Sequence, residues 1–464
     1  MAQVESCTQG VLLSGSRTAI LAGVSIDSRT LSHGDLFFAI RGPRHDGHEY
    51  VPEVLGRGAA GAVVAWDYTP AVPCPDDRIL IKVKDTHQAL KDLAADIRNR
   101  WHGSLIGITG SMGKTTAKEY SAHVLQAGYA VYRSPGNFNN LFGLPLALCR
   151  LRQEHDIGIF EMGMSSHGEI AEMCRMARPE IGVITNVAPV HLEFFSGLED
   201  IAAAKGELAG ALGPSGTLIY CDDDPLVAGI AARFEGKRLP FGIGPNAAVR
   251  AADIEIAGLA ETRFNLITAA ESRAASVPFA GFHHVMNALP AVALGLHFGI
   301  EAGLIIERLR SLPPSPMRGQ VLALQGGLTV IDDSYNSNPQ ALRQMIDTVC
   351  ALSCCQRRVV VAGEMLELGP GGDKLHYDCG AWAARRGVDI LVAVRGTAGE
   401  IARGAIEAGM PQENVRFFSD VDAATTFVAA TVQPGDLVLV KASRGVQLDR
   451  MVRSLCTTRR ERKN

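Results

Sequence analysis

The sequence predicts an α/β protein of three domains, with a mostly parallel sheet in the central domain. The chain has 464 residues, enough for about three domains of ordinary size. From about residue 101 onward, short apolar runs alternate with helical patterns, which is typical of parallel strands joined by helices. Pro313-Pro314-Ser315-Pro316 has the composition of a stiff linker. We therefore expect domains at residues 1–100, 101–315 and 316–464.

The composition narrows the class of function. The chain is 47% hydrophobic and 20% charged, with a net charge of −4, which favours neither nucleic acid nor an acidic membrane surface as a partner. The longest apolar region, residues 285–300, is too short and too polar to span a bilayer, and no signal-peptide pattern is present. Ten cysteines without C-x-x-C spacing are typical of a reducing compartment. We expect a cytoplasmic protein, monomeric by default, without membrane insertion.

Residues 1–100 are expected to form a smaller α/β domain with polar turns. A strand runs into a turn over residues 23–30, and a second strand over residues 34–40 is followed by a loop rich in Gly, Pro, Asp and His. Four polar residues of these turns could together hold a sugar or a diphosphate: Ser28, Arg29, Asp46 and His48. The alternative, which the residues alone favour equally, is that the aspartates only shape the turns.

The central domain carries a candidate phosphate-binding loop. The stretch reads Thr109-Gly110-Ser111-Met112-Gly113-Lys114-Thr115-Thr116, between an expected strand at residues 105–109 and an expected helix at residues 117–127. Backbone N–H groups at such a junction can hold phosphate, the lysine can reach the outer phosphates, and the Thr115 hydroxyl can ligate Mg²⁺. Ile108 stands where the usual motif has its first glycine. The loop predicts ATP binding.

Polar residues follow the next strands of the expected central sheet. Glu161 ends the strand at residues 157–162, where a carboxylate is well placed to hold Mg²⁺. Asn186 ends the strand at residues 181–186, His191 lies in the following loop, and Lys205 follows on a helix. Lys205 could neutralise phosphate, or its neutral amine could react with CO₂ and become an anionic ligand; the residues alone do not distinguish these roles.

Three asparagines and the start of a later helix are further candidates. Asn137, Asn139 and Asn140 precede a helix, and helix capping is favoured there over recognition of a polar ligand. Residues 247–280 are expected to form short alternating strands. Asn287 then lies near the start of a helix, where its amide could pair with a nucleotide base.

The third domain again alternates strands and helices, without the G-x-G-x-x-G pattern of a nicotinamide site. Six of the eight residues from Asp332 to Pro339 are polar, and an acid there could hold ribose hydroxyls, while Asn338 and Pro339 also suit the start of a helix. Lys441-Ala442-Ser443-Arg444-Gly445 follows the last expected strand and could bind an anion such as a carboxylate.

In order along the chain, these stretches resemble the Mur ligases of bacterial peptidoglycan synthesis. The shared marks are the loop at residues 109–116, Glu161-Met162-Gly163, Thr185-Asn186-Val187 with His191-Leu192-Glu193, and Ala204-Lys205-Gly206-Glu207. Gly136-Asn137-Phe138-Asn139-Asn140, residues 332–339 and Met365-Leu366-Glu367-Leu368-Gly369 are most similar to members that join D-alanyl-D-alanine to UDP-N-acetylmuramoyl-tripeptide. The resemblance covers about residues 23–450.

The resemblance implies a UDP-binding N-terminal domain, a P-loop-type central ATPase domain and a Rossmann-like C-terminal domain. It implies the following roles, all for residues of this sequence: Lys114, His191, Lys205 and Arg318 as catalytic residues; residues 109–116, Asn287, Arg318 and Asp333 at ATP; Thr115, Glu161, His191 and carbamylated Lys205 at two Mg²⁺ ions, which Mn²⁺ can replace; and Ser28, Arg29, Asp46, His48, Asn137, Asn139, Asn140, Asn336, Asn338, Ser443 and Arg444 at the substrates.

The implied reaction is ATP-dependent amide-bond formation through an acyl phosphate, in the synthesis of the cell wall on which cell shape and division depend. Three residues depart from the family pattern: His284, Glu364 and Ala442 stand where relatives usually have Asn, Asp and Gly. The alternatives are a ligase that adds the third residue to UDP-N-acetylmuramoyl-dipeptide, folylpolyglutamate synthase, and, in another class, a P-loop ATPase or nucleotide switch.

Overall fold

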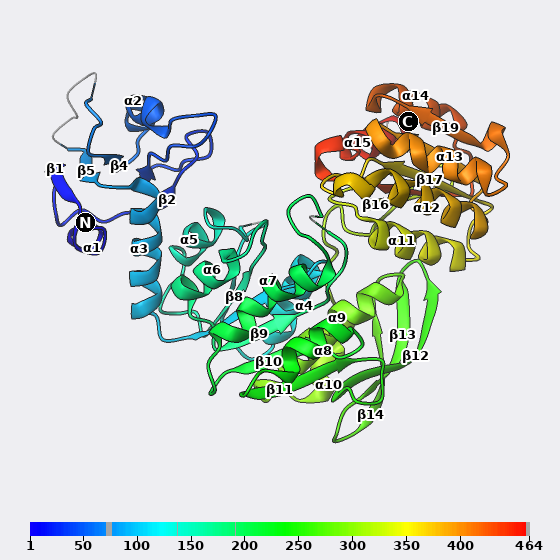
Figure 1. Ribbon diagram of the computed structural model, residues 1–464, viewed down its shortest axis with the longest axis horizontal. Helices are drawn as coiled ribbons and strands as arrows, with labels where there is room; N and C mark the ends of the chain where they lie inside the picture. The colour runs from blue at the N-terminus through cyan, green and yellow to red at the C-terminus, as the bar shows by residue number, and fades with distance from the viewer. Residues whose placement is uncertain (71–76, 137, 191, 461–464) are drawn as a thin grey trace. The chain divides into compact units, whose positions relative to one another are not determined.

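The computed structural model describes residues 1–70, 77–136, 138–190 and 192–460 (Figure 1). Contacts divide the chain into two compact units, which we describe separately. The first comprises Met1–Thr109, Tyr129–Gly182 and Glu207–Thr217, and the second comprises Gly110–Gly128, Val183–Gly206 and Leu218–Asn464. The described residues form three sheets, of five, nine and six strands, among many helices. This is the mixed α/β architecture that the sequence predicts.

The N-terminal part of the first unit is a five-stranded sheet. Its elements are α1 (Ala2–Cys7), β1 (Val11–Ser14), β2 (Gly23–Ser25), β3 (Asp35–Phe38), η1 (Gly47–Tyr50), α2 (Val51–Gly56), β4 (Gly61–Ala65), β5 (Ile79–Val83) and α3 (Thr86–Arg100). The strand order is β1-β5-β4-β3-β2, and only the pairing of β1 with β5 is antiparallel.

The first unit continues with parallel strands that belong to the central domain. The elements are β6 (Ser104–Thr109), β7 (Val131–Arg133), α5 (Gly143–Leu148), β8 (Ile157–Glu161) and α6 (Glu169–Ala177). β8 pairs in parallel with both β6 and β7. β9 (Ile181–Ile184), α7 (Leu198–Ala211) and β10 (Thr217–Cys221) each include a point where the chain passes between the units. Thr109 and Glu161 therefore end neighbouring parallel strands, as predicted.

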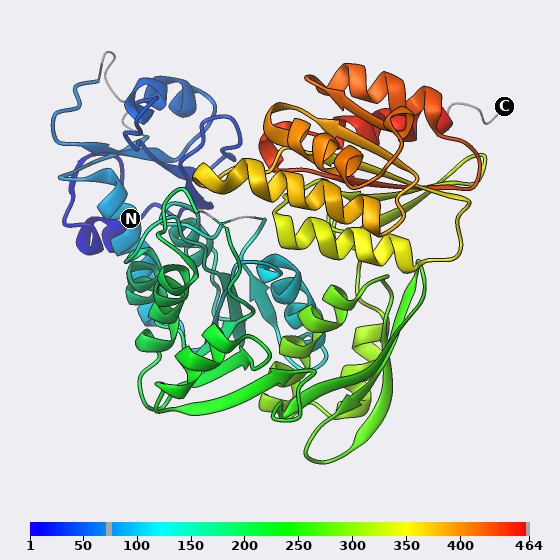
Figure 2. The same cartoon turned by 45° about the vertical axis from the view of Figure 1, so that its right-hand side comes forward.

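The second unit contains the helix that follows the glycine loop and an antiparallel ribbon. Its elements up to residue 310 are α4 (Lys114–Leu125), α8 (Pro225–Ala232), β11 (Lys237–Gly242), β12 (Val249–Gly258), β13 (Glu261–Ile267), β14 (Ser272–Val277), α9 (Phe282–His297) and α10 (Ala302–Arg310). β12, β13 and β14 are the ribbon expected at residues 247–280, and they pack on α9 and α10 (Figure 2). α4 begins three residues earlier than predicted, at Lys114.

The C-terminal part of the second unit is a six-stranded sheet of order β15-β16-β20-β17-β18-β19, with only the β15–β16 pair antiparallel. Its strands are β15 (Gln320–Leu324), β16 (Leu328–Asp333), β17 (Arg357–Gly363), β18 (Ile390–Val394), β19 (Val415–Phe418) and β20 (Asp436–Lys441). The remaining elements are α11 (Pro339–Ala351), η2 (Gly369–Gly371), α12 (Gly372–Arg385), η3 (Gly396–Ala398), α13 (Gly399–Glu407), η4 (Gln412–Asn414), α14 (Val421–Thr431), η5 (Arg444–Val446) and α15 (Asp449–Arg460).

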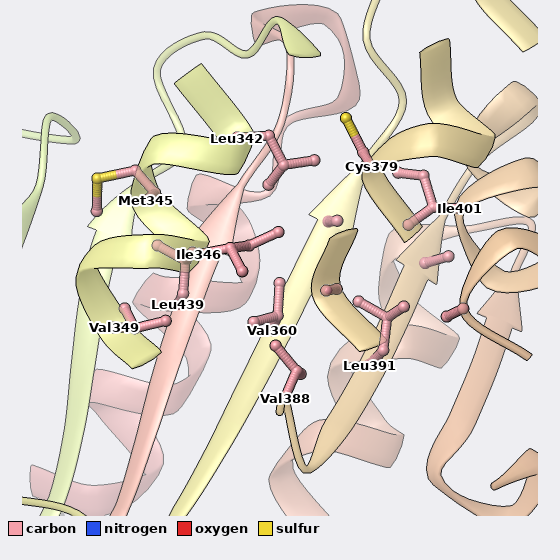
Figure 3. Packing of buried hydrophobic residues seen from close by; sticks show 14 of the residues in the cluster. Leu342, Met345, Ile346, Val349, Val360, Cys379, Val388, Leu391, Ile401 and Leu439 are labelled. Atoms are coloured by element: carbon pink, nitrogen blue, oxygen red, sulfur yellow. The ribbon is translucent and has the colours of Figure 1, made fainter. Parts of the chain in front are cut away.

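Helices cover both faces of this sheet, which explains the continuous apolar runs of its strands. On one face, Val360, Leu391 and Leu439 pack against α11, α12 and α13 (Figure 3). On the other face, their sequence neighbours pack against α14 and α15. Within the described part of the chain, no helix is long and apolar enough to cross a membrane.

Leu439→Ala is expected to destabilise the C-terminal sheet, because Leu439 is fully buried between β20 and α11. Removing three buried carbons and leaving a cavity costs about 2–5 kcal/mol. Urea unfolding followed by tryptophan fluorescence measures the effect, since the half-buried Trp382 packs against the same cluster. The control is Ile406→Ala, at a position 38% exposed, which should shift the midpoint far less. Equal shifts would contradict the packing described here.

Candidate ATP and substrate site

Two glycines of the loop lie where no other residue fits. Gly110 has φ of 147° and Gly113, the residue before α4, has φ of 78°. A Cβ on Gly110 would lie 1.9 Å from Thr185 Oγ1, and a Cβ on Gly113 would lie 2.0 Å from Asn287 Oδ1. The loop backbone therefore lies against both side chains. Asn287, predicted to bind a base, lies directly beside the loop.

The residues after β9 hold the loop in place. Thr185 Oγ1 donates to the Met112 carbonyl over 2.7 Å, and Asn186 Oδ1 accepts from the Met112 N–H over 2.9 Å. The Ser111 N–H donates to the Asn186 carbonyl over 2.9 Å. Ser111 Oγ in turn accepts from the Ala188 N–H over 2.8 Å. These bonds leave the loop little freedom, so its shape is set before any ligand binds. The sequence pattern pointed to Thr185 and Asn186 but carried no signal for these hydrogen bonds.

The side-chain amines of Lys114 and Lys205 lie near enough for the charge of Lys114 to affect the pKa of Lys205. Lys114 Nζ donates to the Gly110 carbonyl over 2.7 Å, which places the ammonium over the loop. Lys205 on α7 is 2% exposed. Burial, and then repulsion from Lys114, hold the pKa of Lys205 well below its ordinary value. Lys205 is therefore held as the neutral amine more readily than a surface lysine, which gives it nucleophilic character.

Arg318 and Thr115 meet at the start of α4. An Arg318 guanidinium nitrogen donates to Thr115 Oγ1 over 3.1 Å. Gly113, Lys114, Thr115, Asn287 and Arg318 thus lie around one helix N-terminus, where the helix dipole and the first-turn N–H groups favour an anion. Backbone amides, a lysine and an arginine on a helix start can together neutralise a polyphosphate.

Glu161 and two of the three asparagines lie in the first unit. Glu161 is 3% exposed, and Asn139 Nδ2 donates to its Oε1 over 2.8 Å. Asn140 Oδ1 accepts from the Gly143 N–H over 2.8 Å at the start of α5, as the capping hypothesis predicts. Asn139 instead orients a buried carboxylate. Asn137 and His191 lie outside the described residues.

The N-terminal candidates divide into exposed and braced side chains. Arg29 is exposed and pairs with Asp27 over 2.8 Å, beside the half-buried Ser28. His48 is 6% exposed, and its Nε2 accepts from the Ala65 N–H over 2.9 Å. Its Nδ1 therefore carries the proton and donates to Asp46 over 2.5 Å. In this arrangement His48 and Asp46 fix the loop, while Arg29 is exposed to solvent.

The C-terminal candidates lie at the carboxyl ends of β16 and β20, where open α/β sheets bind ligands. Asp333 Oδ2 pairs with Lys441 Nζ over 2.5 Å, and the same ammonium donates to the carbonyl of the exposed Asn336 over 3.0 Å. Asn338 caps α11 by accepting from the Ala341 N–H over 2.8 Å.

Ser443 and Arg444 differ in exposure. Ser443 is 4% exposed, and its Oγ accepts from the Leu366 N–H over 2.9 Å. Arg444 is exposed and lies 3.3 Å from Asp449 Oδ1. Glu364, one of the departures from the family pattern, accepts from the Thr397 N–H over 3.0 Å, so its longer side chain still finds a partner.

Each unit offers an oxygen donor of the kind that Mg²⁺ prefers. Thr115 in the second unit has a hydroxyl, and Glu161 in the first unit has a buried carboxylate. Among residues 1–70, 77–136, 138–190 and 192–460, no group of three or more His, Cys, Asp or Glu side chains forms a ready metal site.

An α/β fold with a glycine loop that enters a helix is typical of nucleotide-binding proteins of the P-loop type. Three family models match the chain: the Mur ligase middle domain at residues 108–295, the Mur ligase glutamate ligase domain at residues 317–444, and the Mur ligase family catalytic domain at residues 21–98. The chain belongs to the Mur ligase family. It is an ATP-dependent ligase that forms a C–N bond, as the resemblance predicts.

Individual relatives match the chain over nearly its whole length. The UDP-N-acetylmuramoyl-tripeptide–D-alanyl-D-alanine ligase of Bacillus subtilis is 33% identical over 445 residues, covering 94% of this chain and 93% of the relative. A crystal structure of MurF from Acinetobacter baumannii has a TM-score of 0.86 at 29% identity and covers 98% of both chains. MurF from Thermotoga maritima in complex with ADP has a TM-score of 0.82 at 25% identity, covering 95% of this chain and 98% of that one. These matches confirm the predicted three-domain fold.

Gly113→Ala is expected to weaken ATP binding at least about tenfold, because the new Cβ would meet Asn287 Oδ1 at 2.0 Å on a left-handed backbone. Isothermal titration with a non-hydrolysable ATP analogue measures the affinity. Gly128→Ala is the matched control, since a Cβ there meets nothing within 4 Å. Unchanged affinity of Gly113→Ala would show that the loop can move aside at no cost.

Proposed function

We propose that this enzyme joins D-alanyl-D-alanine to UDP-N-acetylmuramoyl-tripeptide, giving UDP-N-acetylmuramoyl-pentapeptide, ADP and phosphate. The observation that carries the proposal is the match to relatives of that name over more than nine-tenths of the chain, at 32–34% identity. The preformed loop at the start of α4 supports the use of ATP. The product would belong to peptidoglycan precursor synthesis, and we propose that the enzyme is a monomer in the bacterial cytoplasm.

The chemistry begins with an unreactive group, the terminal carboxylate of the tripeptide. Attack of this carboxylate on the γ-phosphorus of ATP forms an acyl phosphate and releases ADP. Lys114 and Arg318, both at the start of α4, would neutralise the charge of the transferring phosphoryl group. The loop amides would hold the phosphates in line with the attacking oxygen.

The free amine of D-alanyl-D-alanine then attacks the acyl carbon. The C–N bond forms, the C–O bond to phosphate breaks, and the amine gives up its proton. Because the acyl phosphate hydrolyses in water, the site must exclude solvent while both substrates are bound. On the nucleotide, Asn287 would contact the adenine and Asp333 the ribose. The resemblance supports both of these roles.

The remaining candidates are proposed for substrates and for metal. Ser28, Arg29 and the Asp46–His48 loop would serve the uridine diphosphate, with His48 shaping the loop. Asn137, Asn139, Asn140, Asn336 and Asn338 would face the peptide, and Ser443 with Arg444 would hold the dipeptide carboxylate. Thr115, Glu161, His191 and carbamylated Lys205 would hold two Mg²⁺ ions, with Mn²⁺ as a substitute; such ions polarise the phosphoryl oxygens.

Phosphate release from ATP tests the reaction. UDP-N-acetylmuramoyl-tripeptide and D-alanyl-D-alanine are added separately and then together, and the products are identified by mass spectrometry. We expect release only when both are present, with a pentapeptide product. Fast release with neither substrate would favour an ATPase or nucleotide switch. Phosphate release that needs a different amino acid would be consistent with the Mur ligase family but would assign the enzyme to another step of the pathway.

Lys205 is predicted to carry a carbamate, because burial keeps the pKa of its amine low and the neutral amine reacts with CO₂. Protonation prevents this reaction, so the carbamate and the activity should be lost together as the pH falls. A carbonyl signal from enzyme equilibrated with ¹³C-bicarbonate should appear in NMR spectra and be absent from Lys205→Gln. Full activity of Lys205→Gln would refute the catalytic role of the carbamate.

A further inference from the structure

We infer that Tyr335 is a positioning residue for catalysis, because its ring holds the guanidinium of Arg318 against the start of α4. This inference rests on the proposed role of Arg318 at the transferring phosphoryl group. Tyr335 lies two residues after Asp333, in the loop that connects β16 to α11. Arg318 lies in the segment that connects α10 to β15.

The two side chains form a close cation–π contact. The central carbon of the Arg318 guanidinium lies 4.1 Å from the centroid of the Tyr335 ring. The other arginine–aromatic contacts among the described residues are longer, at 5.1–6.0 Å. A guanidinium stacked on a ring keeps its N–H groups at its edge available for hydrogen bonds. One of these edge nitrogens donates to Thr115 Oγ1 over 3.1 Å.

The main chain holds the same pair of segments together. The Tyr335 N–H donates to the Met317 carbonyl over 3.2 Å. Met317 has φ of 58°, a left-handed conformation that is uncommon for a residue with a side chain, and Gly319 has φ of 72°. Arg318 therefore lies between two residues with left-handed backbone, next to the residue that is hydrogen-bonded to Tyr335. Such strain persists only where the surrounding structure fixes it, and it often marks a functional site.

The contact matters more for turnover than for the affinity for ATP. A free arginine side chain samples many rotamers, and fixing it during the reaction costs conformational entropy. Tyr335 meets that cost in the folded protein, so that Arg318 is already aimed at Thr115 when charge develops on the phosphoryl group. Loss of the ring should therefore lower kcat while the KM for ATP, which depends on the loop amides and Lys114, changes little.

Steady-state kinetics of two Tyr335 variants test the inference. Tyr335→Leu removes the aromatic face and is expected to lower kcat about tenfold, with a much smaller change in the KM for ATP. Tyr335→Phe keeps the face and should restore most of the lost turnover. If the leucine variant does not fold, as judged by circular dichroism, Tyr335→Met provides a side chain of comparable length without a ring. Equal losses for the Phe and Leu variants would refute the role of the ring.

A matched control and a double-mutant cycle separate this role from a purely structural one. Tyr377→Leu removes a cation–π contact of 5.2 Å with Arg403, between α12 and α13, and should leave turnover unchanged. In an Arg318→Ala background, Tyr335→Leu should have almost no further effect. If the losses of turnover from the two substitutions were additive, Tyr335 would act without Arg318. That result would refute the inference about Tyr335 but leave the proposed role of Arg318 intact. Full activity of Arg318→Ala would refute the proposed role of Arg318 and the inference with it.

Discussion

The nucleotide site depends on a close approach between the glycine loop and two side chains from other parts of the second unit. Gly110 and Gly113 lie so near Thr185 and Asn287 that a single methyl group at either glycine would overlap an oxygen atom. The same approach lets Thr185 and Asn186 bond to the loop backbone. A loop fixed in this way can present its amides to phosphate without first paying the entropy of ordering itself.

Around the fixed loop, positive charge is concentrated at the start of α4. Lys114 lies over the loop and Arg318 reaches Thr115, so positive charge is collected at the start of α4, where the helix dipole adds to it. A further buried ammonium would be unfavourable there, and the pKa of Lys205 is accordingly depressed, first by burial and then by Lys114. A carbamate on Lys205 would reverse the sign of that charge. Under the proposed mechanism, the burial of Lys205 both favours its neutral amine over the ammonium and prepares that amine to become an anionic metal ligand.

The sequence predicted the parts of the fold that are continuous and buried. Apolar runs such as Val359–Val361 and Leu437–Val440, in the third domain where alternating strands and helices were expected, form strands that are covered on both faces. It missed β1, β7, β11 and β15, all of which are partly exposed to solvent. It also missed β5, although Ile79–Val83 is an apolar run. The start of α4 was placed too late, because the residues Lys114 to Thr116 were assigned to the loop rather than to the first turn of the helix.

Within the site, residue type alone could not distinguish residues proposed to bind a ligand from residues that hold the protein's own backbone or side chains in place. Asn140 and Asn338 cap helices, whereas Asn139 orients Glu161 and Asn186 holds Met112. All four are asparagines in loops, and only the partner atom distinguishes their roles. Tyr335 gave no signal for the same reason, because its ring acts through an arginine seventeen positions earlier in the sequence. Such contacts between residues far apart in the sequence depend on the tertiary fold. A local sequence pattern carries no information about them.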